Sequence, residues 1–371
     1  MKVRNLFIAS ITAMLCLTSC GETSSIEESS EAASIEVSSE TASTETSSES
    51  GLVQEALTFK TICPQGAPGL ALSSYLSTDE DKIELSTPLS TKNAFFTTDY
   101  DAIIFDATTA NTLIDVKGAD YKLASIITSG NAFVLSTGKD DNAIMEEGDS
   151  ILSFGNDSSV WNKILKSVFS ITNVSYLGST ALAASAAIAG TNEGEDVDYV
   201  VVSEPYVTKV LQENSSVSVK YNLKNEWSEY SVAQGYNGGL GYTDFPQAGL
   251  FISGALDSAT DEATIDNIKN YIAIIKQNAE DLVSNNGAKV MAQINEDVEA
   301  GLYTTDETFG IDKDILSTVV DSTKSVIGVE NALAFNSSSY DFGGFMTGAS
   351  ALGYSTPSDS FYSQYYFDVS I

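Results

Sequence analysis

The sequence contains no histidine, and its only arginine, Arg4, lies near the amino terminus. The absence of histidine excludes Ser-His-Asp and Cys-His catalysis and removes the commonest zinc ligand. With no other arginine, the chain cannot hold a planar anion through a bidentate guanidinium. We therefore expect a protein that binds rather than catalyses, with no cofactor and no metal site.

Cysteine and positive charge are also scarce. Beyond Cys16 and Cys20 the chain has only Cys63, which follows a strand-like run and is expected to be a buried apolar residue without a disulfide partner. The 18 basic residues face 51 acidic ones, giving a formal net charge of −33. Such an imbalance makes a nucleic-acid partner untenable.

The first 20 residues form an export signal. Lys2 and Arg4 precede a short apolar run that ends in Leu-Thr-Ser-Cys20 and is shorter than a membrane-spanning helix of roughly 20 residues. The four terminal residues resemble the lipobox of bacterial lipoproteins. This resemblance implies a signal peptide over 1–19 and lipidation of Cys20, which would anchor the protein at the extracytoplasmic face of the cell membrane. A signal peptide whose cysteine is coincidental is the alternative.

Residues 20–52 are rich in Ser, Thr and Glu and contain no aromatic residue. A stretch of this composition buries too little apolar area to offset the entropy of ordering it. We expect a disordered tether here, followed by a folded region of some 320 residues that is too long for one core.

Strand-like and helix-like segments alternate along the folded region. Expected strands are 56–63, 100–105, 121–127, 131–136, 149–154, 197–202 and 247–253, and expected helices are 70–76, 106–113, 160–169, 179–190, 261–283, 285–300 and 313–327. This order predicts an α/β fold with two lobes, each a mainly parallel sheet flanked by helices, and a helical C-terminal region. The predicted domains are 53–128 with 256–371 for lobe 1, and 129–255 for lobe 2. The aromatic segment 361–367 is expected to be a packing strand or docking tail.

Several segments in this order resemble the substrate-binding lipoproteins of ABC importers, in the nitrate, sulfonate, taurine and thiamine-precursor group with a type II periplasmic-binding-protein fold. The matching segments are 64–72, 100–108, 121–135, 151–155, 197–205 and 246–251. The resemblance implies a ligand clamped between two lobes, an ABC permease as partner, and a monomer. The missing arginine favours a neutral, aromatic or cationic ligand, while a lysine or a helix N-terminus leaves binding of an anion open.

Ligands of open α/β sheets bind beyond the carboxyl ends of the strands, where small residues let backbone amides approach. The candidate ligand-binding residues in those loops are Gly66, Ala67, Pro68, Thr108, Ser129, Gly130, Asn131, Asn156, Ser158, Glu204 and Tyr242. Each has a structural alternative. These alternatives are turn formation at 66–68, a hinge at Gly130, helix capping at 156–159, a strand end at Glu204 and a surface loop at Tyr242. Asp106 is interpreted as an N-cap, because a bare carboxylate repels an anionic ligand.

Two other functions remain open from the sequence. A surface adhesin would use the tether for display and bind through an exposed face. An extracellular hydrolase would depend on carboxylates alone, and spacing does not single out a pair among 51 acidic residues.

Overall fold

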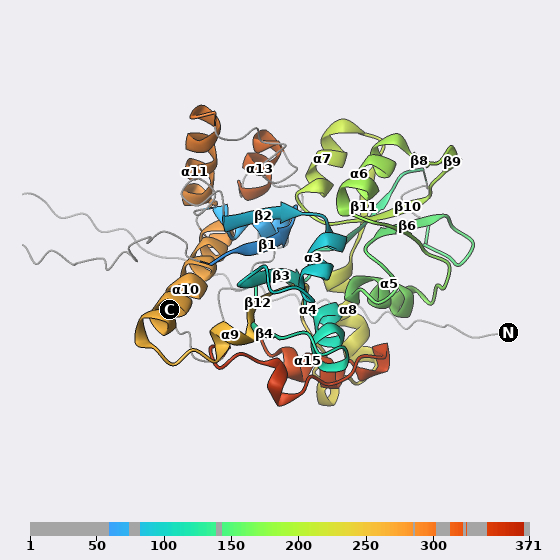
Figure 1. Ribbon diagram of the computed structural model, residues 1–371. Helices are drawn as coiled ribbons and strands as arrows, with labels where there is room; N and C mark the ends of the chain where they lie inside the picture. Colours follow the sequence, from blue (N-terminus) through green and yellow to red (C-terminus); the bar gives the residue numbers. More distant parts are fainter. Residues whose placement is uncertain are drawn as a thin grey trace, which may run out of the picture. The chain divides into compact units, whose positions relative to one another are not determined.

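Two five-stranded sheets organise the folded part of the chain (Figure 1). The computed structural model describes residues 59–73, 82–138, 143–284, 286–301, 312–321, 324 and 340–366. The predicted signal peptide, Cys20 and the tether lie outside these ranges. In the described ranges, no helix is long and apolar enough to cross a membrane.

The first sheet has the strand order β2-β1-β3-β12-β4. Its strands are β1 (Thr61–Pro64), β2 (Ile83–Ser86), β3 (Ala102–Asp106), β4 (Tyr121–Ile126) and β12 (Ala248–Ser253). β1 pairs in parallel with β2 and β3, whereas β12 runs antiparallel to both β3 and β4. The sheet and the helices that cover it form the first lobe.

The second sheet has the strand order β11-β5-β10-β6-β7. Its strands are β5 (Phe133–Ser136), β6 (Ile151–Phe154), β7 (Ser175–Leu177), β10 (Tyr199–Val202) and β11 (Ser218–Asn222). The central strands β5 and β10 are buried along their whole length, as continuous apolar runs predict. A short hairpin of β8 (Thr191–Asn192) and β9 (Glu195–Asp196) lies beside this second lobe.

The two-lobed α/β arrangement is the predicted one, but each sheet is mixed rather than mainly parallel. β5 and β12 are the antiparallel strands, and each directly follows a segment in which the chain crosses from one sheet to the other. The pairing of β12 with β3 and β4 also corrects one predicted assignment. Residues 248–253 belong to the first sheet, although the expected boundary at residue 255 placed them in lobe 2.

All but the last of the following helices lie where the chain connects successive strands, and the last directly follows β12. They are α1 (Ala67–Leu70), α3 (Pro88–Ala94), α4 (Ala107–Asn111), the π-helix η2 (Thr112–Val116), α5 (Val160–Phe169), α6 (Thr180–Ala189), α7 (Tyr206–Glu213), α8 (Leu223–Ala233), η3 (Asn237–Gly239) and α9 (Gly254–Asp257). Local sequence explains their starts, since the side chains of Thr87, Asp106 and Ser179 cap the first turns of α3, α4 and α6. The expected helix over 70–76 differs from the structure. The helix α1 is a single turn that begins at Ala67, where Pro68 fits a first helical turn, and ends at Leu70, while residues 74–76 lie outside the described residues.

A group of C-terminal helices follows β12. These are α10 (Glu262–Ser284), α11 (Ala288–Glu299) and α13 (Lys313–Val320). Their apolar faces share one buried cluster with strands of both sheets, and α13 packs against α7 of the second lobe. Figure 1 shows α13 beside α7.

Residues 340–366, which we call the C-terminal strap, touch both lobes. The strap contains α15 (Phe342–Gly348), η4 (Ser350–Leu352) and η5 (Asp359–Phe361). On the second lobe, Lys163 Nζ donates a hydrogen bond to the Leu352 carbonyl at 2.9 Å, and the Tyr354 hydroxyl donates to the Ser158 carbonyl at 2.8 Å.

The same strap is fixed to the first lobe. Asn111 Nδ2 donates to the Ser355 carbonyl at 3.0 Å, and the Ser363 amide donates to the Leu123 carbonyl at 2.9 Å. Phe361 is completely buried. The aromatic tail is thus a docked segment, as expected, up to the last described residue, Tyr366.

Candidate functional site

A cleft of about 470 Å³ opens beyond the carboxyl ends of β1, β3, β6 and β10, and residues of both lobes line it. The first lobe contributes the loop after β1, the start of α3 and the end of β3. The second lobe contributes the loop after β6, the start of α6 and Ser203 after β10. Asn131 and Gln247, from the two segments that cross between the lobes, also line the cleft. This is the position at which α/β proteins bind ligands.

An aromatic pair forms one wall. Phe154 at the end of β6 and Trp161 in α5 stack with ring centroids 4.5 Å apart and planes at 18°. Trp161 Nε1 donates to the Phe154 carbonyl at 3.0 Å, which fixes the indole. Gly155 has φ +86°, and a Cβ there would lie 2.7 Å from Trp161 Cζ2, so glycine is required for the rings to stack. The wall is therefore rigid and flat.

Two leucines stand at the rim of the cleft, one on each lobe. Leu89 at the start of α3 is 67% exposed, and Leu182 in α6 is 56% exposed. Together with Phe105 and Tyr206, they give the lining a largely apolar character. A ligand that covered these side chains would remove apolar surface from water, which favours binding.

Among the described residues that line the cleft, Asp106 is the only charged one. Its Oδ1 accepts hydrogen bonds from the Thr109 amide at 2.6 Å and the Thr108 hydroxyl at 2.9 Å. Its Oδ2 is buried and has no hydrogen-bond partner among the described residues. Burial raises the pKa of this carboxyl, and the hydrogen bonds from Thr109 and Thr108 oppose that shift only in part.

Amide side chains connect the crossing segments behind the cleft. Gln247 accepts from the Asn131 amide at 2.8 Å and donates to the Asn131 carbonyl at 2.9 Å. The Asn131 side chain in turn donates to the Glu204 carbonyl at 3.1 Å and accepts from the Glu204 amide at 2.8 Å. This reciprocal pairing fixes the position of the loop after β10 relative to both crossing segments.

Five of the eleven predicted ligand-binding residues line the cleft. They are Gly66, Ala67, Pro68, Asn131 and Asn156. No bound molecule tests their contact with a ligand, so that contact stays a prediction. Cys20, the predicted lipidation site, lies outside the described residues.

The other six residues do not line the cleft. Thr108 donates to Asp106, and Ser158 donates its amide to Asn156 Oδ1 at 2.8 Å within the loop before α5. Glu204 turns its carboxylate away from the cleft, where it accepts from the amide and hydroxyl of Thr208 at 2.9 and 2.7 Å.

Glu204 is fully buried, and burial raises its pKa to about 7. The sequence showed that a polar residue ends β10, but not that the next helix, α7, would use it as an internal cap. The expected position facing the cleft belongs instead to Ser203 and Tyr206.

Ser129, Gly130 and Tyr242 support the crossing segments and the strap. Ser129 Oγ donates to Asp244 at 2.6 Å, and Gly130, with φ +67°, packs directly against the same carboxylate. The Tyr242 hydroxyl donates to the Gly344 carbonyl of the strap at 2.9 Å. The hinge alternative for Gly130 thus agrees with its place in a crossing segment.

Sequence reasoning missed the aromatic wall, the two rim leucines and Gln247. The sequence did hold a signal for Trp161. A predicted strand ends at residue 154, a serine-rich loop follows, and Trp161 is the second residue of the predicted helix after that loop. Leu89 and Leu182 had none, since exposed and buried leucines look alike in a sequence.

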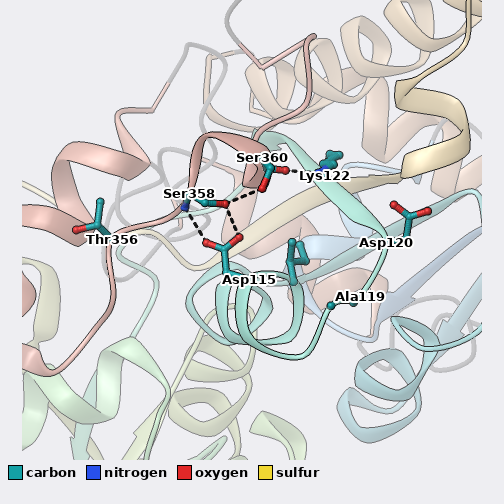
Figure 2. Close-up of a pocket in the computed structure, with 9 residues that line it drawn as sticks. Asp115, Ala119, Asp120, Lys122, Thr356, Ser358 and Ser360 are labelled. Carbon is teal, nitrogen blue, oxygen red and sulfur yellow. Dashed lines mark hydrogen bonds between the residues drawn. The ribbon is translucent and has the colours of Figure 1, made fainter.

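A second hollow, of about 620 Å³, lies where the strap meets the first lobe (Figure 2). Asp115 accepts hydrogen bonds from the amide and hydroxyl of Ser358, both at 2.7 Å, and Lys122 donates to the Ser360 carbonyl. Figure 2 shows these side chains directed at the strap. Because these polar groups hold the strap, we take the cleft between the lobes as the candidate site.

No family model and no curated protein matches the sequence. Among solved structures, an ABC transporter structure from Parabacteroides distasonis matches with a TM-score of 0.52 and 14% identity, over 82% of this chain and 98% of that chain.

Two further structures match less closely. A zinc-bound ligand-binding component of an ABC-type import system from Staphylococcus aureus has a TM-score of 0.48 and 13% identity, over 69% of this chain and 81% of that chain. The periplasmic aliphatic sulphonate binding protein SsuA from Escherichia coli has a TM-score of 0.44 and 13% identity, over 70% and 77%. At such identities a match shows the fold alone, and of these three only the match to the Parabacteroides distasonis structure has a TM-score above 0.5. The chain has a two-lobed α/β fold, as its sequence predicted, and shares it with that ABC transporter structure.

Proposed function

We propose that this protein is the solute-binding component of an ABC importer, which captures a small molecule in the cleft between its lobes. The observation that carries the proposal is the cleft itself. It lies beyond the strand ends, is built from both lobes and the crossing segments, and has an apolar lining with few polar groups. These are the properties of small-molecule sites. No catalytic step is part of the proposal.

Two crossing segments give the proposed binding a mechanism. The Gly130 amide donates to the Phe245 carbonyl at 2.9 Å, and the Gln247 amide donates to the Thr128 carbonyl at 2.9 Å, so the segments run side by side. A ligand that contacts both lobes favours the closed arrangement by its extra contacts there. A permease that recognises this arrangement would accept only the loaded protein.

The test is a thermal-shift screen of vitamins, pyrimidines, sulfonates, polyamines and oligopeptides. Gly178 lines the cleft, and a Cβ at this residue meets no atom within 4 Å, so Gly178→Trp fills cleft space without strain in the backbone. Gly148→Trp is the matched control, because Gly148 is equally unobstructed and lies outside the cleft.

A compound that stabilises the wild type and Gly148→Trp but not Gly178→Trp would support the proposal, since a ligand raises the unfolding temperature only when it binds the folded state. A screen in which no compound stabilises the wild type would refute it. So would stabilisation that persists in Gly178→Trp.

We also propose that Cys20 carries the lipid that holds the protein at the extracytoplasmic face of the membrane, with residues 21–52 as a tether. The support is the sequence Leu17-Thr-Ser-Cys20 after a short apolar run. Mass spectrometry of the mature protein should find an acylated amino-terminal cysteine. Release of wild type and Cys20→Ala into the medium in equal amounts would contradict it.

A further inference from the structure

The charge of the cleft is one-sided. In the part of the lining that the structure describes there is no lysine and no arginine, and the single charged side chain is the Asp106 carboxylate. Burial raises the pKa of this carboxyl and so disfavours its charged form. A cationic ligand would restore that charge, whereas an anionic ligand would oppose it and would find no basic partner in the described lining.

Only one of the two carboxylate oxygens of Asp106 takes part in capping α4. As the N-cap of α4 it employs Oδ1, which accepts from the amide of Thr109 and the hydroxyl of Thr108. Oδ2 is buried and receives no hydrogen bond among the described residues. Buried polar atoms are nearly always paired, and this one belongs to a residue that lines the cleft, so a donor entering from the cleft would satisfy it after a small movement of the lining.

The apolar part of the cleft has a flat boundary. The stacked Phe154 and Trp161 rings give it an aromatic surface, and Leu89 and Leu182 extend the apolar lining to the rim. Aromatic rings pack against such a surface by offset stacking, and a cation beside an indole gains a further attraction. The volume of about 470 Å³ accommodates a bicyclic molecule.

We propose that the ligand is a flat aromatic or heteroaromatic molecule with a cationic nitrogen group, whose N–H donors pair with the Asp106 carboxylate while its ring lies against Trp161. This inference rests on the proposed function, because it specifies what the same cleft binds. A binding site for an anion would gain from a basic group in the cleft, whereas the charged group in the described lining is acidic.

Three isosteric probes test the charge. 2-Naphthamidine is cationic, 2-naphthamide is neutral and 2-naphthoate is anionic, and all three present the same bicyclic ring. Binding to the purified full-length protein is measured by isothermal titration. Tryptophan fluorescence gives a second readout, since the chain has only two tryptophans and Trp161 is the one in the cleft.

The variant is Asp106→Asn, which removes the charge and keeps a side-chain oxygen for the helix cap, because Asn and Asp cap helices about equally well. Asp341→Asn is the control. Asp341 caps α15 by accepting from the Gly344 amide three residues later, as Asp106 does in α4, but it lies outside the cleft. Both variants change the net charge of −33 by the same amount.

We expect 2-naphthamidine to bind the wild type and Asp341→Asn equally, and Asp106→Asn at least about tenfold more weakly, as the loss of a charged hydrogen bond predicts. The naphthoate should not bind the wild type. Equal affinity for the amidine and the amide, or an unchanged affinity in Asp106→Asn, would overturn the inference.

The two proposals fail in different ways. If the amide or the naphthoate binds as tightly as the amidine and Gly178→Trp abolishes this binding, the cleft is a ligand site and only the charge inference is wrong. If no probe binds, the inference is wrong and the broad screen decides the proposed function. If a probe binds Gly178→Trp as well as the wild type, the cleft is not the site and both proposals fail.

Discussion

Phe361 joins the strap to the core of the first lobe, and its truncation should destabilise the whole folded region. The ring is completely buried. It packs against Phe342, Tyr362 and Phe251 of β12, with centroids 5.5, 5.3 and 6.0 Å away. The neighbouring rings belong to two different parts of the chain, so they would not close on a vacated space without moving the strap.

Phe361→Ala removes the phenyl group and leaves a cavity. Both effects cost free energy, and for a fully buried phenylalanine the loss is about 3–5 kcal/mol. Single domains have a free energy of unfolding of about 5–15 kcal/mol, so the variant should lose a large fraction of its stability. Urea titration followed by circular dichroism measures the difference.

The matched control is Phe96→Ala, since Phe96 is 54% exposed and its truncation should change stability by about 0.5 kcal/mol or less. A loss below about 1 kcal/mol in Phe361→Ala would refute the reasoning. It would mean that the strap separates from the core before the rest of the domain unfolds, and that its contacts do not contribute to the global free energy.

Two further changes test the crossing segments and the buried acid. Gly130→Ala should lower the free energy of unfolding by about 1–3 kcal/mol, because φ is +67° and the added Cβ would clash with Asp244 Oδ1. The control Gly118→Ala, at φ +74° with no neighbour within 4 Å, should lower it less. Equal losses of stability in thermal unfolding would contradict this. Burial raises the pKa of Glu204 from 4.5 to about 7, so between these values the unfolded chain binds fewer protons and stability falls as pH rises, by about 3 kcal/mol in total. Glu204→Gln should remove this decrease in the free energy of unfolding, measured by urea titration from pH 5 to 8. If stability changed with pH in the same way in the variant and the wild type, the reasoning would be wrong.

The sequence predicted elements best where one local pattern decides the structure. Val160–Phe169 was expected as a helix over the same residues and is α5, because its apolar spacing and its serine-rich start agree. The two buried strands β5 and β10 were found for a similar reason. Position in the chain also located several of the loops that line the cleft, because strand ends can be read from apolar runs.

Partner choice and side-chain direction were harder to predict. The apolar run at 248–253 fits either sheet, and only its pairing with β3 and β4 assigns it to the first. The strand β11 and the helix α8 were missed, because β11 is half-buried at a sheet edge and its residues alternate weakly. Glu204 was expected to contact a ligand in the cleft, but the start of α7 holds its carboxylate on Thr208.

The strap also affects how often the cleft can open. An opening of the cleft that detached the strap from the second lobe would break the hydrogen bonds from Tyr354 to Ser158 and from Lys163 to Leu352. At about 1 kcal/mol each, these two bonds would oppose such an opening by about 2 kcal/mol. A ligand that enters only after the strap has detached would therefore associate more slowly than diffusion alone allows. Substitutions in the strap could change this association rate without altering the cleft.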